Sequence, residues 1–239
     1  GEDFHAARAE HILAEAGLST DALQCPPAVP GGTAAREEFT RAGRTAERVL
    51  MNCSGKHSAF LAACVHNGWS THDYLDPEHP LQVLVRETVE DLCGERVAHT
   101  AVDGCGAPQL ATTLTGLARG LHRMRTAPEG SHEHAVLTAM STHPEYVSGT
   151  DRIDTVLMRR LPGLVSKIGA DGVMVLSAPS GETVAVKISD GDAETRARTP
   201  VALNALRAID VDNSPSQDLL RVDVLGGGRP VGEVRPCPS

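Results

Sequence analysis

The spacing of apolar residues changes along this 239-residue chain, and the change restricts the fold class. Up to residue 160 the apolar residues recur mostly with helical spacing. Residues 172–176 and 182–189 instead read as two strands, joined by a turn rich in Pro, Ser and Gly at 179–182. A helical first part followed by late antiparallel strands predicts an α+β fold.

Turn residues and helix-stop residues delimit the predicted elements. Gly17, Gly68 and Gly94 directly follow apolar periodic segments and mark helix ends. A short strand is predicted over residues 97–102, and a second hairpin over 220–234 around Gly226. We predict helices over residues 3–16, 33–42, 54–67, 80–93, 109–124, 131–142, 151–160 and 195–208.

Composition excludes several classes of partner. The net charge is −9 with no basic run, which argues against nucleic acid and acidic membranes. No apolar stretch approaches 18 residues, so we expect no transmembrane helix. The six cysteines form no Cys-x-x-Cys pair, which favours a reducing, cytoplasmic compartment. Cys64 lies in an apolar helical segment, and we expect it to be buried and inert.

Lysine is scarce in this chain. Only Lys56, Lys167 and Lys187 occur among 22 basic residues, and the rest are arginine. Arginine stays protonated in proteins, whereas lysine can lose its proton when it is desolvated or lies near other cations. The lysines are therefore candidates for positions that use a free amine, although Lys167 lies in no recognisable motif.

The segment 52–57 contains the densest run of reactive side chains. A loop enters a helix there, and free backbone N–H groups favour anions and lower a thiol pKa. Cys53 and Lys56 lie three residues apart and therefore share one helical face. Three interpretations remain open: Cys53 is a nucleophile activated by Lys56 or His57, Cys53 and Lys56 are metal ligands, or the segment is a helix cap with a buried cysteine.

A glycine-flanked cysteine follows the predicted strand at 97–102. Gly104 and Gly106 let the backbone around Cys105 approach another group closely. Cys105 can join Cys53 at a zinc ion, because thiolates suit zinc. Asp103 can hold a substrate ammonium or orient a ligand. The alternative is a glycine-rich turn that Asp103 caps.

Two cations further along the chain are also candidates. Lys187 shares one strand face with Ala185 and Ser189. Such a lysine is either solvated or acts as a proton shuttle for a hydroxyl nucleophile, as in the Lys-Thr-Gly strand of serine acyl-transferring enzymes. Arg152 lies where a loop with Pro and Gly runs into a helix, and it either binds a carboxylate bidentately or is structural.

Four ordered segments, at residues 52–57, 103–108, 143–155 and 186–191, together resemble the asparaginase II family, the Rhizobium-type or class 3 L-asparaginases. The resemblance implies one domain over residues 1–239 with a fold related to serine β-lactamases and glutaminases. It also implies a homodimer that hydrolyses L-asparagine to L-aspartate and ammonia.

The resemblance assigns roles to individual residues. It implies that Cys53, Lys56 and Cys105 bind zinc. It also implies that Asp103 is a catalytic residue near the substrate, and that Lys187 pairs with a catalytic serine. We also expect three residues to take part in substrate binding: Ser54, His57 and Arg152.

The chain departs from the family pattern in one respect. The family carries a Ser-x-x-Lys nucleophile, but the residues three positions before the lysines are Cys53, Leu164 and Val184. The family's second catalytic serine precedes Gly-Glu, and this chain opens with Gly1 and Glu2, so we expect both serines upstream. The alternatives are an inactive subunit or non-catalytic zinc-binding domain, and a cysteine hydrolase that uses Cys53.

Overall fold

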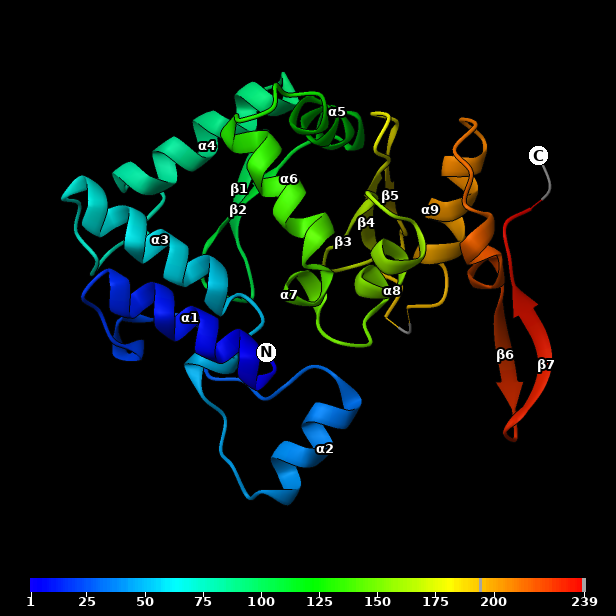
Figure 1. Ribbon diagram of the computed structural model, residues 1–239, viewed down its shortest axis with the longest axis horizontal. Coiled ribbons are helices and arrows are strands. Elements are labelled where there is room, and N and C mark those ends of the chain that lie inside the picture. Colours follow the sequence, from blue (N-terminus) through cyan, green and yellow to red (C-terminus); the bar gives the residue numbers. More distant parts are fainter. Residues whose placement is uncertain (194, 238–239) are drawn as a thin grey trace. The chain divides into compact units, whose positions relative to one another are not determined.

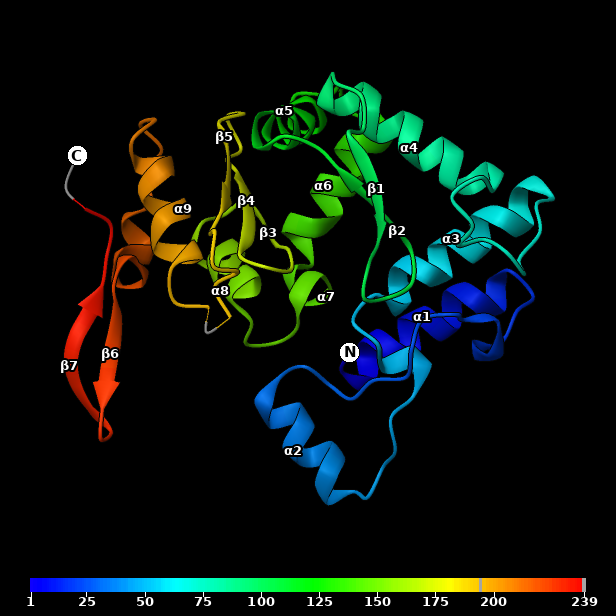
Figure 2. The ribbon, with the colours of Figure 1, turned by 180° about the vertical axis from the view of Figure 1, so that it is seen from behind.

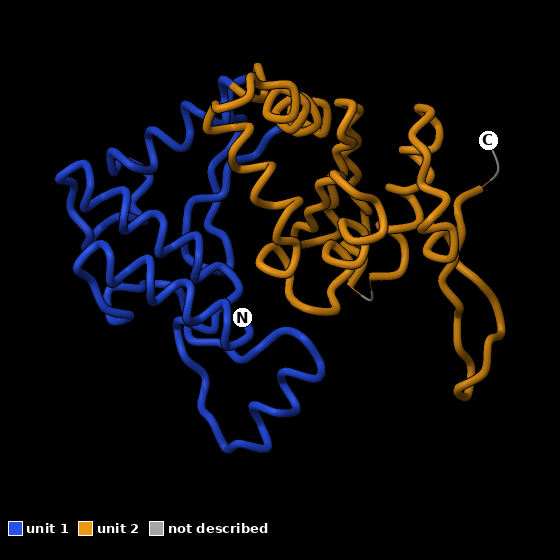
Figure 3. Tube along the Cα trace, viewed as in Figure 1, with its two compact units in different colours: residues 1–91, 95–112 blue, residues 92–94, 113–239 orange. Residues whose placement is uncertain are grey.

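The structure is a computed structural model that describes residues 1–193 and 195–237. The chain divides into two compact units, which are described separately (Figure 3). Unit 1 contains residues 1–91 and 95–112, and unit 2 contains residues 92–94 and 113–239. Residues 238 and 239, the end of the predicted domain, lie outside the described residues.

Unit 1 is mainly helical. Helix α1 (Asp3–Glu15) packs against α3 (Ser54–Asn67) (Figure 1). Both helices contact the short η2 segment (Arg48–Leu50). Large apolar side chains such as Leu13, Leu50 and Leu61 fill its core. Its elements are α1 (Asp3–Glu15), η1 (Thr20–Ala22), α2 (Thr33–Arg41), η2 (Arg48–Leu50), α3 (Ser54–Asn67), most of α4 (Pro80–Cys93), and the antiparallel pair β1 (His99–Val102) and β2 (Pro108–Ala111).

Helix α3 carries the reactive segment and has one buried face. Its buried residues recur at helical spacing and include His57, Leu61 and Cys64. Cys64 is buried and forms no disulfide, which confirms the predicted burial of that thiol. The helix ends at Gly68, whose φ of 69° is a left-handed conformation that glycine adopts without strain.

Unit 2 is built on an antiparallel sheet in the order β3-β4-β5. Figures 1 and 2 show the sheet between α9 on one side and α6 and α7 on the other. Leu157, Leu176 and Leu203 belong to its apolar core. Its elements are α5 (Leu114–Arg125), α6 (His132–Thr142), α7 (Pro144–Ser148), α8 (Ile153–Arg160), β3 (Val165–Ile168), β4 (Val173–Ser177), β5 (Thr183–Lys187), α9 (Arg198–Arg207), η3 (Ser214–Leu220) and the hairpin of β6 (Val222–Gly226) and β7 (Arg229–Val234).

Helices with small antiparallel sheets confirm the α+β prediction, although three details were wrong. The predicted helix over 109–124 begins only at Leu114, because Thr113 caps it by accepting a hydrogen bond from Gly116 N, and residues 108–111 pair with β1 instead. Strand β3 was missed because it is only four residues long and buries Ser166. The predicted loop after residue 143 contains the short helix α7.

None of the helices among residues 1–193 and 195–237 combines the length and apolar character that a membrane crossing requires.

Candidate functional site

The structure brings four of the predicted site residues together in unit 1. One donor atom from each of Cys53, Asp103 and Cys105 lies within 4.8 Å of the others. Lys56 Nζ lies 3.3 Å from Cys105 Sγ and 3.9 Å from the Asp103 carboxylate. We call Cys53, Lys56, Asp103 and Cys105 the thiol cluster. Two are contributed by the start of α3 and two by the turn between β1 and β2.

The turn between β1 and β2 has a defined backbone geometry. Asp103 N donates to the carbonyl of Ala107 at 2.9 Å, and Gly106 N donates to the carbonyl of Asp103 at 2.8 Å. Gly106 has a φ of 90°, which side chains with a Cβ rarely adopt. The turn therefore requires a glycine next to Cys105, whose side chain is fully buried.

Asp103 is the anionic member of the cluster. The Cys105 thiol donates a hydrogen bond to its carboxylate at 2.9 Å. This bond, backbone N–H groups and the charge of Lys56 together lower the pKa of Asp103 below its usual value. The cluster therefore keeps a carboxylate beside a cation and two sulfur atoms at neutral pH.

The Cys53 thiol differs from the expectation for a helix N-terminus. Burial raises its pKa to about 11, and the nearby charge of Lys56 opposes this only in part. The predicted lowering by backbone N–H groups is therefore wrong for the metal-free protein, because desolvation outweighs it. A neutral thiol is a poor nucleophile, which disfavours the cysteine hydrolase alternative.

The donor set of the thiol cluster fits zinc. Tetrahedral zinc binds sulfur at about 2.3 Å, which separates two sulfur ligands by roughly 4 Å. Donor atoms within 4.8 Å of one another meet that requirement with small movements. Two thiols, a carboxylate and an amine suit a borderline-soft cation better than Mg²⁺ or Ca²⁺, which prefer oxygen.

His57 and Ser54 lie on the buried face of α3. His57 Nδ1 lies 2.7 Å from the hydroxyl oxygen of Tyr74. Burial, assisted by the charge of Lys56, lowers the pKa of His57 to about 4, and burial raises the pKa of Tyr74 to about 12. Both side chains are therefore neutral near pH 7. Ser54 is buried in the first turn of the helix, and its carbonyl accepts a hydrogen bond from Ser58.

Sequence reasoning missed Tyr74 and Cys25. Tyr74 is fully buried and also accepts a hydrogen bond from Gln24 N at 3.0 Å. Cys25 is buried, and the pKa of its thiol is raised mainly by burial, with Cys105 and Lys56 close enough to affect it. Tyr74 is one of only two tyrosines in a chain poor in aromatic residues, and this scarcity was the available signal.

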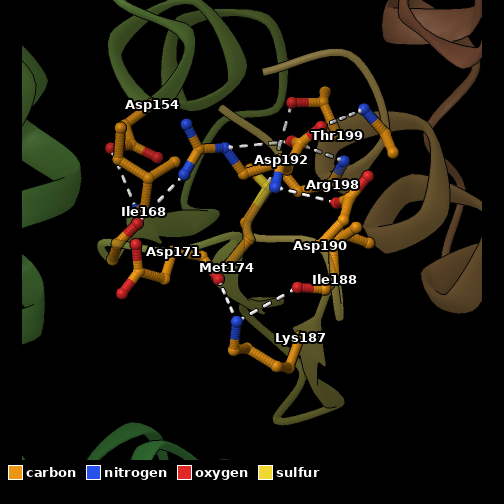
Figure 4. Close-up of polar contacts among 12 residues, drawn as sticks. Asp154, Ile168, Asp171, Met174, Lys187, Ile188, Asp190, Asp192, Arg198 and Thr199 are labelled. Carbon is orange, nitrogen blue, oxygen red and sulfur yellow. Dashed lines mark hydrogen bonds and ion pairs between the residues drawn. The ribbon is translucent and has the colours of Figure 1, made fainter. Parts of the chain in front are cut away.

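Lys187 lies in unit 2 at the end of β5, opposite Val173 of β4. Its Nζ donates to the backbone carbonyl of Asp171 and, at 3.0 Å, to that of Ile188 (Figure 4). Val186, the neighbour on the other strand face, is buried in the core as the alternation predicts. The described partners of Lys187 are therefore backbone oxygens of its own sheet region.

A buried ion pair supports the loop that follows Lys187 (Figure 4). Asp192 accepts hydrogen bonds from Ala197 N at 2.8 Å and Arg198 N at 3.1 Å, at the start of α9. The Arg198 guanidinium lies 3.6 Å from the Asp192 carboxylate and donates to the carbonyl of Gly169 at 3.0 Å. These contacts tie the loop after β5 to the end of β3.

Arg152 also lies in unit 2, exposed at the residue preceding α8. The buried Thr155 hydroxyl in α8 lies within hydrogen-bond distance of the carbonyls of Pro144 and Gly149, at 3.0 and 2.6 Å. These contacts hold the segment at residues 144–149 against the helix. Lys167, the third lysine, donates to the carbonyl of Ile168 at 2.6 Å on the surface.

The thiol cluster on an α+β framework defines a candidate metal-binding protein. The sequence model of the L-asparaginase II family matches residues 1–236, and the chain belongs to this family. The match confirms the family resemblance. Membership suggests asparagine amidohydrolase activity on a small-molecule amide. A search of curated proteins gives no match.

Proposed function

We propose that the protein hydrolyses L-asparagine to L-aspartate and ammonia. The observation that carries the proposal is the family match over residues 1–236, which includes the thiol cluster and the lysine at the end of β5. The family indicates hydrolysis of an amide, and the side-chain amide of asparagine is the substrate that its name implies.

Zinc is the metal that we propose for the thiol cluster, with Cys53, Lys56 and Cys105 as ligands. When bound, zinc supplies a positive charge that binds and orients an oxygen or nitrogen ligand. Metal coordination requires deprotonated thiols, so the hydrogen bond from Cys105 to Asp103 would be lost on binding. Asp103 then keeps a carboxylate beside the ligands, where it can hold the substrate ammonium or orient a ligand.

We propose that a serine hydroxyl attacks the amide carbon, with Lys187 as the proton shuttle. The Lys187 amine takes the hydroxyl proton as the serine oxygen forms the acyl bond. The proton then passes to the departing nitrogen, which leaves as ammonia, and water hydrolyses the ester. The carbonyls of Asp171 and Ile188 hold the Lys187 Nζ in place at the end of β5.

Three further residues complete the proposed binding groups. Arg152 offers an exposed guanidinium that can pair bidentately with a substrate carboxylate. Ser54 and His57 offer a hydroxyl and an imidazole on α3. We also propose that residues 1–239 form one functional domain related to β-lactamases and glutaminases, and that the protein is a cytoplasmic homodimer.

Ammonia release from L-asparagine tests the proposal, using the zinc-loaded protein from its complete coding sequence. We expect hydrolysis of L-asparagine, and its loss in Cys105→Ser, whereas Cys237→Ser should keep it because Cys237 is exposed and lies outside the cluster. Zinc binding without ammonia release from L-asparagine, L-glutamine or other linear amides would support a non-catalytic zinc-binding domain instead.

A further inference from the structure

Tyr74 and His57 form a buried hydrogen-bonded pair in unit 1. Both side chains have an exposed fraction of 0%, and their rings meet edge to face with centroids 5.7 Å apart. His57 Nδ1 lies 2.7 Å from the Tyr74 oxygen, which also accepts a hydrogen bond from Gln24 N at 3.0 Å. The two hydrogen bonds of this oxygen decide where the imidazole proton lies.

The Tyr74 oxygen already accepts one hydrogen bond from the backbone. If His57 Nδ1–H also donated to it, the Tyr74 hydroxyl hydrogen would have no acceptor among the residues that the structure describes. When the hydroxyl donates to Nδ1 instead, the Tyr74 oxygen and Nδ1 are both satisfied. The neutral ring then carries its proton on Nε2.

His57 Nε2 is buried and has no hydrogen-bond partner within residues 1–193 and 195–237. Buried N–H groups in folded proteins nearly always have an acceptor, so such a group is expected to meet a water or ligand oxygen. His57 follows Lys56 directly, at the end of the reactive segment of α3.

We propose that Tyr74 is a positioning residue that holds His57 as the Nε2–H tautomer, so that His57 donates a hydrogen bond to an oxygen of the amide substrate. The substrate class rests on the proposed function, whereas the tautomer does not. In this arrangement Tyr74 occupies the Nδ1 lone pair and Nε2 carries the proton. His57 therefore has no free lone pair and does not act as a base for Cys53 or for any other nucleophile.

Nitrogen NMR of the full-length protein labelled with ¹⁵N-histidine tests the tautomer directly. The chain has 11 histidines, and the signals that disappear in His57→Gln identify His57. We expect a protonated Nε2 and an unprotonated Nδ1, and a shift of both signals in Tyr74→Phe. Tyr146→Phe, which alters the other tyrosine, should leave them unchanged. A protonated Nδ1, or no response to Tyr74→Phe, would overturn the proposal.

A double-mutant cycle with L-asparagine tests the role of the pair. We expect Tyr74→Phe to lower kcat/KM on the order of tenfold, because His57 is freed to rotate or exchange tautomers. Glutamine in His57→Gln keeps an N–H donor but has no tautomers, so this variant should retain part of the activity. In that background Tyr74→Phe should change kcat/KM by less than about twofold.

An equal effect of Tyr74→Phe in both backgrounds would mean that Tyr74 acts only through structure, and it would overturn the proposal. A wild-type protein that releases no ammonia would defeat the proposed function instead. The NMR result does not depend on catalysis and still decides the tautomer in that case.

Discussion

The two lysines of the family motifs differ in what surrounds them. Lys56 in unit 1 contacts a thiol and a carboxylate, both from the turn at residues 103–107. Lys187 in unit 2 contacts two backbone carbonyls near its own sheet. Side chains that offer sulfur and oxygen are metal ligands, whereas fixed carbonyls hold an amine in one orientation. This difference supports our proposal that Lys56 binds the metal and that Lys187 transfers a proton.

We expect the largest effect from replacing Lys187, which should lower kcat without changing zinc binding. Lys187→Met removes the amine but keeps most of the stem, and we expect kcat to fall about 10²- to 10⁴-fold while zinc content stays the same. Lys167→Met is the matched control, because Lys167 also donates to a backbone carbonyl on the surface. The measurement is ammonia release together with metal analysis. A fall in zinc content with Lys187→Met would remove the distinction between the two sites.

The next effect concerns the buried pair that supports the loop after Lys187. Asp192→Ala leaves the Arg198 guanidinium buried without its carboxylate and removes two acceptors at the start of α9. We expect the free energy of unfolding to fall by about 3–5 kcal/mol, as urea titration can measure. Zinc affinity should change little.

An exposed ion pair provides the control for this stability measurement. Arg160 Nη1 lies 2.7 Å from Asp218 Oδ1 on the surface of unit 2. Asp218→Ala should cost at most about 1 kcal/mol, because solvent screens exposed pairs. Equal losses from Asp192→Ala and Asp218→Ala would show that the buried pair has no special role.

Zinc affinity tests whether the thiol cluster, which contains Lys56, binds the metal. Cys105→Ser removes one thiolate from the cluster, and we expect zinc affinity to fall by more than the roughly 10- to 100-fold that changes outside the ligand shell cost. A competitive titration against a chelator measures this. Cys64→Ser alters a buried thiol elsewhere on α3 and should not affect it. Unchanged zinc content and unchanged asparagine affinity in Cys105→Ser would reject the ligand assignment.

The last expected effect is a dependence of stability on pH in unit 1. The pKa of His57 is about 4 in the folded protein and about 6.5 in the unfolded chain. The unfolded state therefore binds more protons, and stability falls as the pH drops from about 6.5 towards 4. We expect His57 to contribute a loss on the order of 2–3 kcal/mol by pH 4.5.

Urea titrations of metal-free protein at pH 7 and pH 4.5 measure this loss. His57→Gln cannot take up the proton, so the loss on acidification should be smaller in that variant by the amount that His57 contributes. If both proteins lose the same stability between these two pH values, His57 is not held neutral by burial.

Sequence patterns predicted most of the helices, because apolar spacing and glycine stops act locally. Gly68 ends α3 at the predicted position, and Pro80 begins α4 as expected. The patterns failed where tertiary pairing decides: residues 108–111 form a strand only because β1 lies beside them.

The candidate site was predicted only in part, for a similar reason. The motifs predicted a shared site for Cys53, Lys56, Asp103 and Cys105, and the structure brings these four side chains together. The raised pKa of Cys53 depends on burial, which the local pattern could not supply. The hydrogen bond between Tyr74 and His57 joins residues that no motif connects, so only the structure reveals it.

Zinc titration into metal-free protein, with ammonia release from L-asparagine followed in parallel, tests the central claim most directly. The account predicts that binding and activity both saturate at about one zinc per chain, because the described residues contain one thiol cluster. Ammonia release that is complete without zinc and unaffected by its addition would contradict a functional role for the cluster.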